Sequence, residues 1–490
     1  MPRSAEVVIG LDVGTSGTKA LAVTDDATVV ATGRTDSPAD PTDVGAAACE
    51  AIAQAVAEAG RPVAGVALSG AMHSLVGLDA DGGALTPLLT WADHRADEQA
   101  RRLRDGDLHR RTGTPVHPMS PLCKLIWWRE EEPETFAAVR RWVGVKELVV
   151  RALTGELLID HGTASGTGMR NLRTEDWDDE ALALAGLAPD RLPALVPSTH
   201  VTRLTAAGTG LPAGTPVVVG GADGPLANLG LGAIRPGTVA CSIGTSGAVR
   251  AAVDAPALDD RGQLFCYVLG PDRWVVGGAT SNGGSVLDWL GEAVAPDLAG
   301  PEEILRAAAA APAGSRALLF LPHLEGERAP EWTTGARGAY LGLRGEHGRA
   351  DLLRAGLEGV CLQLARVLAS LADAGVEVAE VRATGGFARS ALWRGVLASA
   401  FGRPIGFAES AEGSSLGAAL LGMTALGMLA SLDAAADLVA VTHVEEPDRD
   451  AAAAYAAMLP AFAAAQDAVA PIAQALRDWS EPAPTYRQRD

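Results

Sequence analysis

Two stretches of this sequence share one pattern: residues 7–23 read VVIGLDVGTSGTKALAV, and residues 237–253 read GTVACSIGTSGAVRAAV. In each stretch a run of β-branched and small apolar residues leads into Gly-Thr-Ser-Gly, and a second apolar run follows. Short apolar runs joined by small turn residues predict a β-hairpin. The two turns begin at Gly14 and Gly244, nearly half of the 490 residues apart. The pattern therefore predicts two lobes of similar fold.

A second pair of similar segments strengthens this prediction. Residues 65–74, GVALSGAMHS, and residues 380–390, EVRATGGFARS, are each a short apolar run that ends in glycine and other small residues. A single four-residue match arises by chance. Two repeats in the same order are typical of a duplicated fold.

Strand-like and helix-like segments alternate between these repeats. Residues 217–220 and 317–321 have the composition of strands, whereas residues 352–374 and 415–429 have the length and apolar spacing of helices. This alternation predicts an α/β fold with layered sheets and helices.

Proline-rich breaks near residues 211–216 and 235–237 precede the second hairpin and indicate a domain boundary. The alanine-rich segment that follows the second lobe is expected to be helical, and its polar, proline-containing end to be disordered. The expected parts are an N-terminal lobe at 1–235, a C-terminal lobe at 236–440, a helical segment at 441–478 and a disordered tail at 479–490.

The composition excludes several classes of protein. Hydrophobic residues make up 48% and charged residues 20%, as in ordinary globular chains. A net charge of −20 argues against nucleic acid as a partner, because cations are needed to displace counterions from a phosphate backbone. The five cysteines form no CxxC pair and no even set. We therefore expect neither a zinc site nor disulfides, and a reducing cytoplasm fits.

No membrane segment is expected either. Glu6 and Asp12 interrupt any apolar core of a secretory signal near the N-terminus. The alanine-rich residues 451–476 contain Pro460, Pro471 and several polar residues, and alanine is too weakly apolar to drive insertion. A surface or packed helix is expected there instead.

The two Gly-Thr-Ser-Gly turns could hold phosphate groups. Successive backbone N–H groups and short hydroxyls suit a phosphate, and glycine permits its close approach. One such turn is more often a plain hairpin turn, but two facing one cleft could hold a polyphosphate from both sides. Asp12, at the end of the first strand, would suit Mg²⁺. Lys19, on the return strand, could reach a phosphate or point into solvent.

Asp223 is the candidate general base. It lies in VVVGGADGPLANLG, residues 217–230, directly after an apolar strand and at the start of a helical run. An acid at this place can simply cap the helix. The flanking Gly221 and Gly224, however, would let a substrate approach closely. Phosphoryl transfer to an alcohol needs a carboxylate that accepts the hydroxyl proton.

Two polar clusters at strand ends could bind a sugar. Met72 and His73 end one strand, and residues 91–95, Trp-Ala-Asp-His-Arg, end another. Ligands gather at strand ends in open α/β sheets, and the second cluster is dense enough to bind a polyol. A structural histidine and solvated charges at the start of a helix are the alternatives.

Together these segments resemble the FGGY family of carbohydrate kinases over residues 7–428. Eight motifs carry the resemblance: LDVGTSGTK (11–19), SGAMHS (69–74), TWADHRA (90–96), MSPLCKLIWW (119–128), GGADGPLAN (220–228), SIGTSG (242–247), LPHLEGERAP (321–330) and ATGGFARS (383–390).

The resemblance implies two actin-like, ribonuclease H-like lobes with the active site in the cleft between them. It implies Asp223 as the catalytic base and Asp12 with Asp223 as the Mg²⁺ side. ATP phosphates are expected at Gly14, Thr15, Ser16, Lys19, Gly244, Thr245 and Ser246. Adenosine is expected at Gly385, Gly386 and Arg389, and the sugar at Met72, His73, Trp91 and Asp93.

Within the family, residues 111–125, 265–284 and 326–343 resemble members that phosphorylate the sugar acid gluconate. Pentulose kinases tend to carry glutamine and asparagine where this chain has Ala71 and Ala92. We therefore expect ATP-dependent phosphorylation of gluconate at O6. The alternatives are another sugar specificity, such as xylulose, and a non-catalytic actin-like module.

A sugar acid also needs a cation for its carboxylate. The candidates near the sugar motifs are His73, Arg95 and Lys124, with Arg170 less favoured. The sequence leaves the oligomeric state open, with a homodimer as one alternative.

Overall fold

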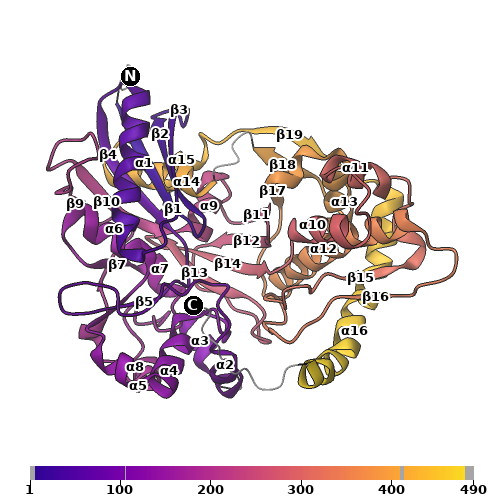
Figure 1. The fold of residues 1–490 in the computed structure, drawn as a ribbon. Coiled ribbons are helices and arrows are strands. Elements are labelled where there is room, and N and C mark those ends of the chain that lie inside the picture. The colour runs from indigo at the N-terminus through magenta and orange to yellow at the C-terminus, as the bar shows by residue number, and fades with distance from the viewer. Residues whose placement is uncertain (1–5, 105, 409–412, 481–490) are drawn as a thin grey trace.

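The computed structural model describes residues 6–104, 106–408 and 413–480. The chain forms two lobes that lie side by side, each built on a large β-sheet with helices packed against it (Figure 1). The N-terminal lobe is indigo to magenta in the figure, and the C-terminal lobe is mostly orange and yellow.

The N-terminal sheet has six strands in the order β3-β2-β1-β4-β10-β9. Their bounds are β1 Val7–Val13, β2 Gly17–Thr24, β3 Val29–Asp36, β4 Val63–Gly70, β9 Val201–Arg203 and β10 Pro216–Ala222. β1 and β2 form the predicted antiparallel hairpin, in which Asp12 lies opposite Lys19. β4 then pairs parallel to β1.

The C-terminal sheet repeats this arrangement. Its order is β13-β14-β12-β11-β17-β18-β19, with β11 Thr238–Ile243, β12 Gly247–Val253, β13 Phe265–Gly270, β14 Arg273–Thr280, β17 Glu380–Thr384, β18 Ile405–Ala408 and β19 Val441–Glu445. β11 and β12 form the second predicted hairpin, and β17 pairs parallel to β11. The repeated topology confirms the α/β, actin-like fold with two lobes.

Helices cover both sheets, and the short helices and strands between β4 and β9 extend the N-terminal lobe. The N-terminal helices are α1 Val44–Ala59, α2 Asp97–Leu103, α3 Leu108–Thr112, α4 Pro121–Glu131, α5 Pro133–Ala138, α6 Val145–Thr154, α7 His161–Ser165, α8 Asp179–Ala185 and α9 Asp223–Gly230, with short strands β5 Val76–Leu78, β6 Arg141–Val143, β7 Leu158–Asp160 and β8 Ala194–Val196. Helices α2, α4 and α8 enclose a separate small core around Trp128 and Trp142.

In the C-terminal lobe the long helix α12 forms the centre of the core. The remaining elements are α10 Ser285–Ala293, α11 Pro301–Ala308, β15 Leu319–Leu321, β16 Ala339–Leu341, α12 Arg349–Asp373, α13 Ala391–Phe401, α14 Gly413–Ala425, α15 Leu432–Ala436 and α16 Arg449–Ser480. α14 follows the C-terminal sheet in the sequence but packs on the N-terminal lobe, against α9, β1 and β4 (Figure 1). The chain passes from the N-terminal lobe to the second sheet between α9, which ends at Gly230, and β11, which begins at Thr238. We propose the boundary between the lobes at 235/236.

Two expectations for the C-terminal segment are wrong. Residues 441–445, expected to be helical, form strand β19 on the edge of the second sheet, antiparallel to β18. The β-branched Val441, Thr442 and Val444 suit a strand, and an unpaired edge was available for them. The helix after it, α16, continues through Ser480, so residues 479 and 480 belong to it. The rest of the expected tail, 481–490, lies outside the described residues.

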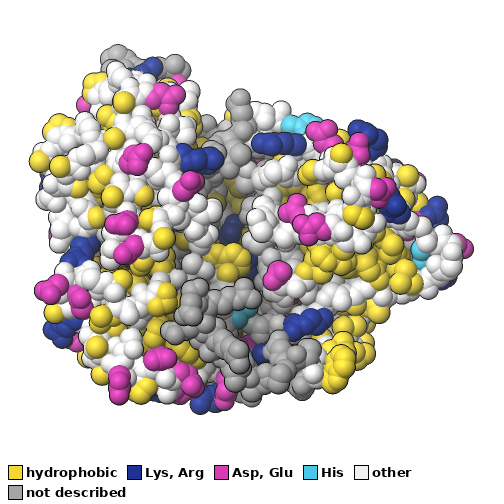
Figure 2. All heavy atoms as spheres, in the orientation of Figure 1, with side chains coloured by type: hydrophobic (Ala, Val, Ile, Leu, Met, Phe, Trp, Pro, Cys, Tyr) yellow, Lys and Arg dark blue, Asp and Glu magenta, His cyan; other side chains and the backbone are white. Residues whose placement is uncertain are grey.

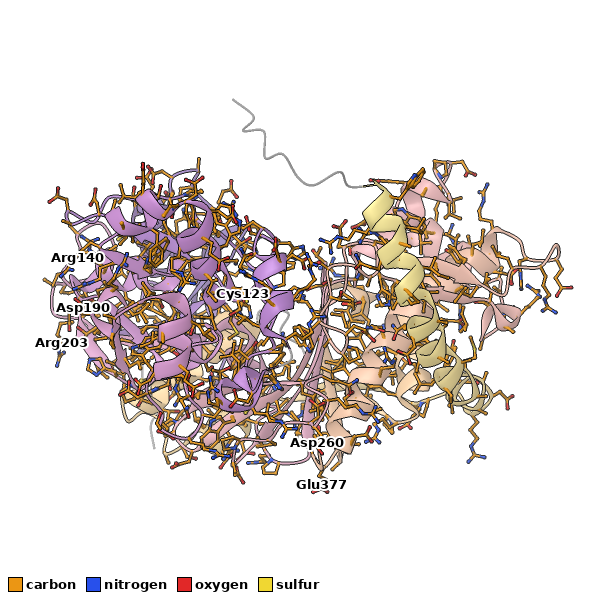
Figure 3. All side chains as sticks on the ribbon, turned by 90° about the horizontal axis from the view of Figure 1, so that it is seen from below. Cys123, Arg140, Asp190, Arg203, Asp260 and Glu377 are labelled. Atoms are coloured by element: carbon orange, nitrogen blue, oxygen red, sulfur yellow. The ribbon has the colours of Figure 1, made fainter. Side chains whose placement is uncertain are left out.

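By length and composition alone, two described helices could cross a membrane, which is weak support for a span. α12 is 83% buried over its apolar window and forms core, whereas α16 is 17% buried. Viewed from below, α16 runs along the C-terminal lobe (Figure 3), where it packs on α13 and α12.

A buried ion pair connects four elements of the N-terminal lobe, α6, β7, α7 and β10. Lys146 on α6 and Asp160 at the end of β7 are both fully buried and hydrogen-bonded to each other. The Lys146 ammonium also donates to the Val219 carbonyl of β10 at 3.0 Å. Asp160 caps α7, since its carboxylate accepts from the Thr163 backbone N–H at 2.9 Å. Each charge is therefore satisfied only while its partner is present.

We predict that Lys146→Met lowers the free energy of unfolding by about 3–5 kcal/mol, because it leaves a buried, unpaired carboxylate. Denaturant titration measures the loss. The double variant Lys146→Met/Asp160→Asn should recover part of it, since asparagine is neutral and caps a helix as well as aspartate does. A single variant as stable as the wild type would contradict the assigned role of the pair.

Candidate active site

A cavity of about 350 Å³ opens between the two lobes. Figure 2 shows the molecular surface hollowed between the lobes, with hydrophobic and basic side chains visible inside. Its wall includes Thr15, Met72, His73, Trp91, Asp223, Thr245, Ser246, Arg250, Tyr267 and Arg328. Residues far apart in the sequence, from both repeats, thus meet at one place.

Asp223 lies on the cavity wall as the first residue of α9, where the apolar strand β10 ends. Its side chain does not cap the helix: Ala222 occupies the cap position, and the Asp223 carboxylate accepts from the adjacent Gly224 backbone N–H at 2.8 Å. Burial, and secondarily the carboxylate of Asp12, raise the pKa of Asp223 to about 6. A carboxylate poised at this pKa can take up a proton near neutral pH.

Asp12 is held in place by hydroxyls from two other elements. Its two oxygens accept from the Ser69 hydroxyl of β4 at 2.6 Å and from the Ser414 hydroxyl of α14 at 2.8 Å. In the described parts of the chain, no cluster of three or more His, Cys, Asp or Glu side chains could hold a metal. Two carboxylates such as Asp12 and Asp223 are compatible with Mg²⁺, which is usually bound by one or two carboxylates, water and substrate phosphates.

The two Gly-Thr-Ser-Gly turns face the cavity unequally. Thr15 of the first turn and Thr245 and Ser246 of the second line it, whereas Gly14, Ser16 and Lys19 are not among the lining residues. Both turns are tight: Gly14 N–H donates to Gly17 O, and Gly244 N–H to Ser246 O, each at 2.9 Å.

A second cavity of about 770 Å³ adjoins the second turn. Gly244 and Thr245 form one side of it, and Gly386, Phe387, Arg389 and Trp393 form another. Neighbouring Gly385 has φ +123°, and a Cβ there would lie 2.1 Å from the Ile243 carbonyl oxygen. Only glycine permits this approach. Because Thr245 lines both cavities, an elongated ligand could extend from one into the other.

The predicted sugar-binding residues are brought together except for one. Met72, His73 and Trp91 line the first cavity. His73 has a left-handed backbone (φ 64°), and its Nδ1 donates to the Gly166 carbonyl oxygen at 2.8 Å. Burial, reinforced by Lys124, lowers the pKa of His73 to about 3, so the ring is neutral. Asp93 is not among the lining residues, and its carboxylate accepts two hydrogen bonds from Arg95 Nε at 2.9 and 3.1 Å.

Arg250, Tyr267 and Arg328 also line the first cavity, although the sequence did not predict them as site residues. Arg250 follows the second turn on β12, two positions after the lining residue Ala248 and therefore on the same strand face. Arg328 lies within LPHLEGERAP, one of the family motifs. The motif alone did not indicate which of its side chains faces the cavity.

The cleft lies between two actin-like lobes, with a Gly-Thr-Ser-Gly turn from each lobe and the acid Asp223, whose pKa is raised, on its wall. This arrangement is suited to phosphoryl transfer. The chain belongs to the FGGY family of carbohydrate kinases: the family's N-terminal domain matches residues 7–230 and its C-terminal domain matches residues 239–426. It is therefore a carbohydrate kinase, and ATP is the phosphoryl donor that the family implies.

Three comparisons show how similar this chain is to named relatives. It is 38% identical to a gluconokinase of Bacillus subtilis, covering 93% of this chain and 94% of that protein. It is 31% identical to a xylulose kinase of the same organism, covering 88% and 90%. A crystal structure of gluconate kinase from Lactobacillus acidophilus superposes with a TM-score of 0.91 at 32% identity, covering 95% and 99%.

The raised pKa of Asp223 predicts a pH dependence. A base must be deprotonated to act, so kcat/KM should fall about tenfold per pH unit below an apparent pKa near 6. Steady-state rates between pH 4.5 and 8.5 measure this limb. The residual rate of Asp223→Asn should lack it, and a limb that persists in that variant would assign the titration to another group.

Proposed function

We propose that this enzyme transfers the γ-phosphoryl group of ATP to O6 of D-gluconate, yielding 6-phosphogluconate. The observation that carries the proposal is the greater sequence identity to the gluconokinase than to the xylulose kinase, over nearly the whole of both chains. The alternative acceptor is a pentulose such as xylulose, since a relative of that name also matches along most of its length.

In this proposal Asp223 is the base. The O6 hydroxyl attacks the γ-phosphorus in line, its proton passes to the Asp223 carboxylate, and the bond from the γ-phosphorus to the β,γ-bridging oxygen breaks to leave ADP. Asp12 and Asp223 would hold Mg²⁺, which offsets negative charge on the phosphates when it is bound. The Asp12 side chain is pre-oriented for this by its two serine donors.

In this proposal the two cavities would hold different parts of the reacting complex. The first cavity, with Met72, His73 and Trp91, would hold the sugar acid, and Asp93 would act at its edge. The second, with Gly385, Gly386 and Arg389, would hold adenosine against Phe387 and Trp393. The backbone and hydroxyls of the two turns, Gly14, Thr15, Ser16, Gly244, Thr245 and Ser246, would contact the phosphates together with Lys19. An ATP-consuming sugar kinase fits the cytoplasm, where ATP is supplied.

We predict that gluconate gives the highest kcat/KM in a panel that includes xylulose, ribulose, glycerol and other aldonates. The margin should be at least about tenfold, or about 1.4 kcal/mol of transition-state preference. A coupled ADP-release assay measures it. A pentulose preferred over gluconate would contradict the proposal. If no acceptor in the panel stimulated ADP release, a non-catalytic role would be favoured.

The Asp223→Asn variant tests the proposed base. An amide cannot take the proton, so kcat should fall by roughly 10²-fold or more while the KM for gluconate changes by only a few-fold. Thermal unfolding should be unchanged or slightly improved at pH 8, because an acid whose pKa is raised by folding destabilises the fold above that pKa.

The matched control for this substitution is Asp178→Asn. Asp178 caps α8 away from the cavity and accepts from the Ala181 backbone N–H at 2.9 Å. That variant loses an ion pair with Arg111, at 3.1 Å, but keeps the cap and lies outside the cavity, so it should keep kcat within about twofold. A cleanly folded Asp223→Asn enzyme with nearly full kcat would remove Asp223 from the chemistry.

A further inference from the structure

A kinase for a sugar acid must hold a carboxylate inside a protein of net charge −20. Such a protein repels the substrate at long range, so cations have to be concentrated locally in the cleft. This requirement rests on the proposed function. A cation that meets this requirement must have donors that face the first cavity.

The four cations that lie near the sugar motifs in sequence do not meet this requirement. The Lys124 ammonium is buried and donates to the backbone carbonyls of His73, at 2.9 Å, and Thr90, at 2.5 Å. Arg95 forms an ion pair with Asp93 at 2.9 Å. None of Lys124, Arg95 and Arg170 lines the cavity. His73 does line it but is neutral.

Arg170 is held elsewhere. Its Nε donates to His161 Nδ1 at 3.0 Å, and only 2% of the residue is exposed. Its Nη1 is buried and has no partner within the described structure, but Arg170 is not among the residues that line the first cavity.

Arg250 does face the cavity. Its guanidinium lies beside Gly224, where an added Cβ would be 3.5 Å from Arg250 Nε. Its Nη1 donates a long hydrogen bond of 3.4 Å to the Ser242 hydroxyl. Among the described residues no carboxylate lies within 4.0 Å of it to form an ion pair. The acid that acts on it most strongly is Asp223, and burial lowers the pKa of Arg250.

Arg328 faces the same cavity from another segment of the C-terminal lobe, a loop that follows β15. Its guanidinium carbon lies 4.7 Å from the centre of the Trp91 ring, and Nη2 donates to the Thr280 carbonyl at 2.6 Å. Its Nε is buried and has no partner within the described structure. Burial lowers the pKa of Arg328 to about 10, a value at which it is still charged at neutral pH.

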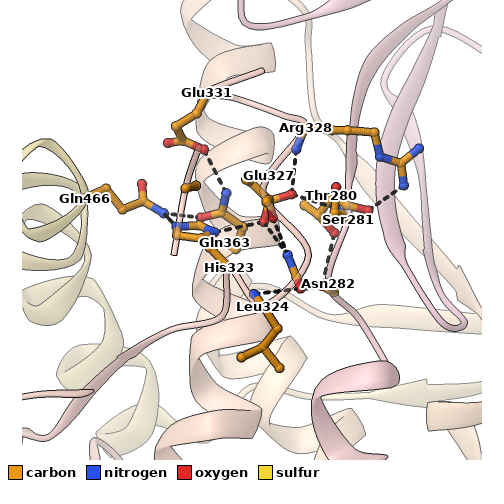
Figure 4. A network of polar contacts seen from close by, with 12 residues as sticks. Thr280, Ser281, Asn282, His323, Leu324, Glu327, Arg328, Glu331, Gln363 and Gln466 are labelled. Carbon is orange, nitrogen blue, oxygen red and sulfur yellow. Dashed lines mark hydrogen bonds and ion pairs between the residues drawn. The ribbon is translucent and has the colours of Figure 1, made fainter. Parts of the chain in front are cut away.

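A polar network fixes the backbone of Arg328 (Figure 4). The Glu327 carboxylate accepts from the Ser281 N–H at 2.6 Å and from the Arg328 N–H at 2.9 Å. His323 Nδ1 lies 3.1 Å from the same carboxylate, and Gln466 of α16 contacts His323 Nε2 at 2.9 Å. Glu327 is thus occupied by the network, and the Arg328 guanidinium points away from it.

We propose that Arg250 and Arg328 together bind the carboxylate of gluconate and thereby select a sugar acid over a neutral sugar. Two guanidinium groups that line one partly buried cavity repel each other, and an anion between them relieves that repulsion. Planar guanidinium donors suit a carboxylate because they form paired, charge-assisted hydrogen bonds. The stacked Trp91 ring and the Thr280 carbonyl hold Arg328 in position for this contact.

The competing role for Arg250 is a contact to the γ-phosphate, because it lies near Asp223. The two roles differ in the substrate they affect. A carboxylate-binding residue matters for gluconate and not for D-glucitol, which has a hydroxymethyl group in place of the carboxylate. A phosphate-binding residue matters equally for both, and for ATP.

The test compares Arg250→Met and Arg328→Met with the wild type on both substrates. The KM for gluconate should rise and its kcat/KM should fall by roughly 10²-fold or more, as for other buried charge pairs that lose one partner. The kcat/KM for glucitol and the KM for ATP should change by less than about threefold. Calorimetric titration of gluconate, with a non-hydrolysable ATP analogue present, gives the same comparison as binding constants.

Arg382→Met is the matched control, because its guanidinium is engaged by Glu380 at 2.8 Å and it lines neither cavity. It should leave the ratio of gluconate to glucitol activity unchanged. The variants Arg250→Lys and Arg328→Lys keep the charge but lose the planar donor pair, so they should give intermediate losses on gluconate alone. They also provide the comparison if a methionine variant does not fold.

Equal losses on gluconate and glucitol, or a raised KM for ATP, would overturn the proposal and assign the guanidinium to the phosphates. Unchanged gluconate binding in both methionine variants would overturn it as well. A wild-type enzyme that prefers a neutral pentulose is a different result, since it contradicts the proposed function itself.

Discussion

The close contact of α14 with α9 and β1 is the constraint on which the site depends. A Cβ at Gly230 would lie 1.9 Å from the Gly413 carbonyl oxygen, one at Gly417 1.9 Å from the Leu226 oxygen, and one at Gly10 2.0 Å from the Ser415 oxygen. Glycine on both sides lets the backbones approach as no other residue would. Asp223 begins α9, Asp12 ends β1 and Ser414 belongs to α14, so this single contact positions both carboxylates and one of their hydroxyl partners.

The cavity is chemically asymmetric although the fold is duplicated. Each lobe contributes a hairpin turn and a parallel strand end, but the surrounding segments differ. The N-terminal lobe adds the neutral His73 and the Trp91 ring, whereas the C-terminal lobe adds Arg250 and a loop that carries Arg328. Asp223 comes from the N-terminal lobe and the two arginines come from the C-terminal lobe, so the site exists only where the lobes meet.

Charge within the cleft runs against the charge of the whole protein. The chain is strongly acidic overall, yet Arg250 and Arg328 lie close enough to Asp223 to interact with it. Basic groups in a low-dielectric cleft concentrate anionic substrates there. The same groups favour the ionised form of Asp223, which limits the rise in its pKa caused by burial and by Asp12. Binding of anions and tuning of the base are therefore coupled in one cavity.

The sequence by itself determined the two hairpins, the further strands β4 and β17 and the place of Asp223 at a strand end, because these depend on local apolar patterning and turn residues. It also indicated Met72, His73 and Trp91 for the same reason. It did not reveal strand β19, since Val441 and Thr442 became a strand only by pairing with a distant edge. The cations it suggested for the substrate carboxylate, apart from His73, do not line the cavity. Proximity in sequence favoured Arg95 and Lys124, but whether a cation is free to meet a ligand depends on which carbonyls and carboxylates surround it. Only the tertiary structure decided that, by engaging Lys124 and Arg95 with their neighbours and leaving Arg250 and Arg328 facing the cavity.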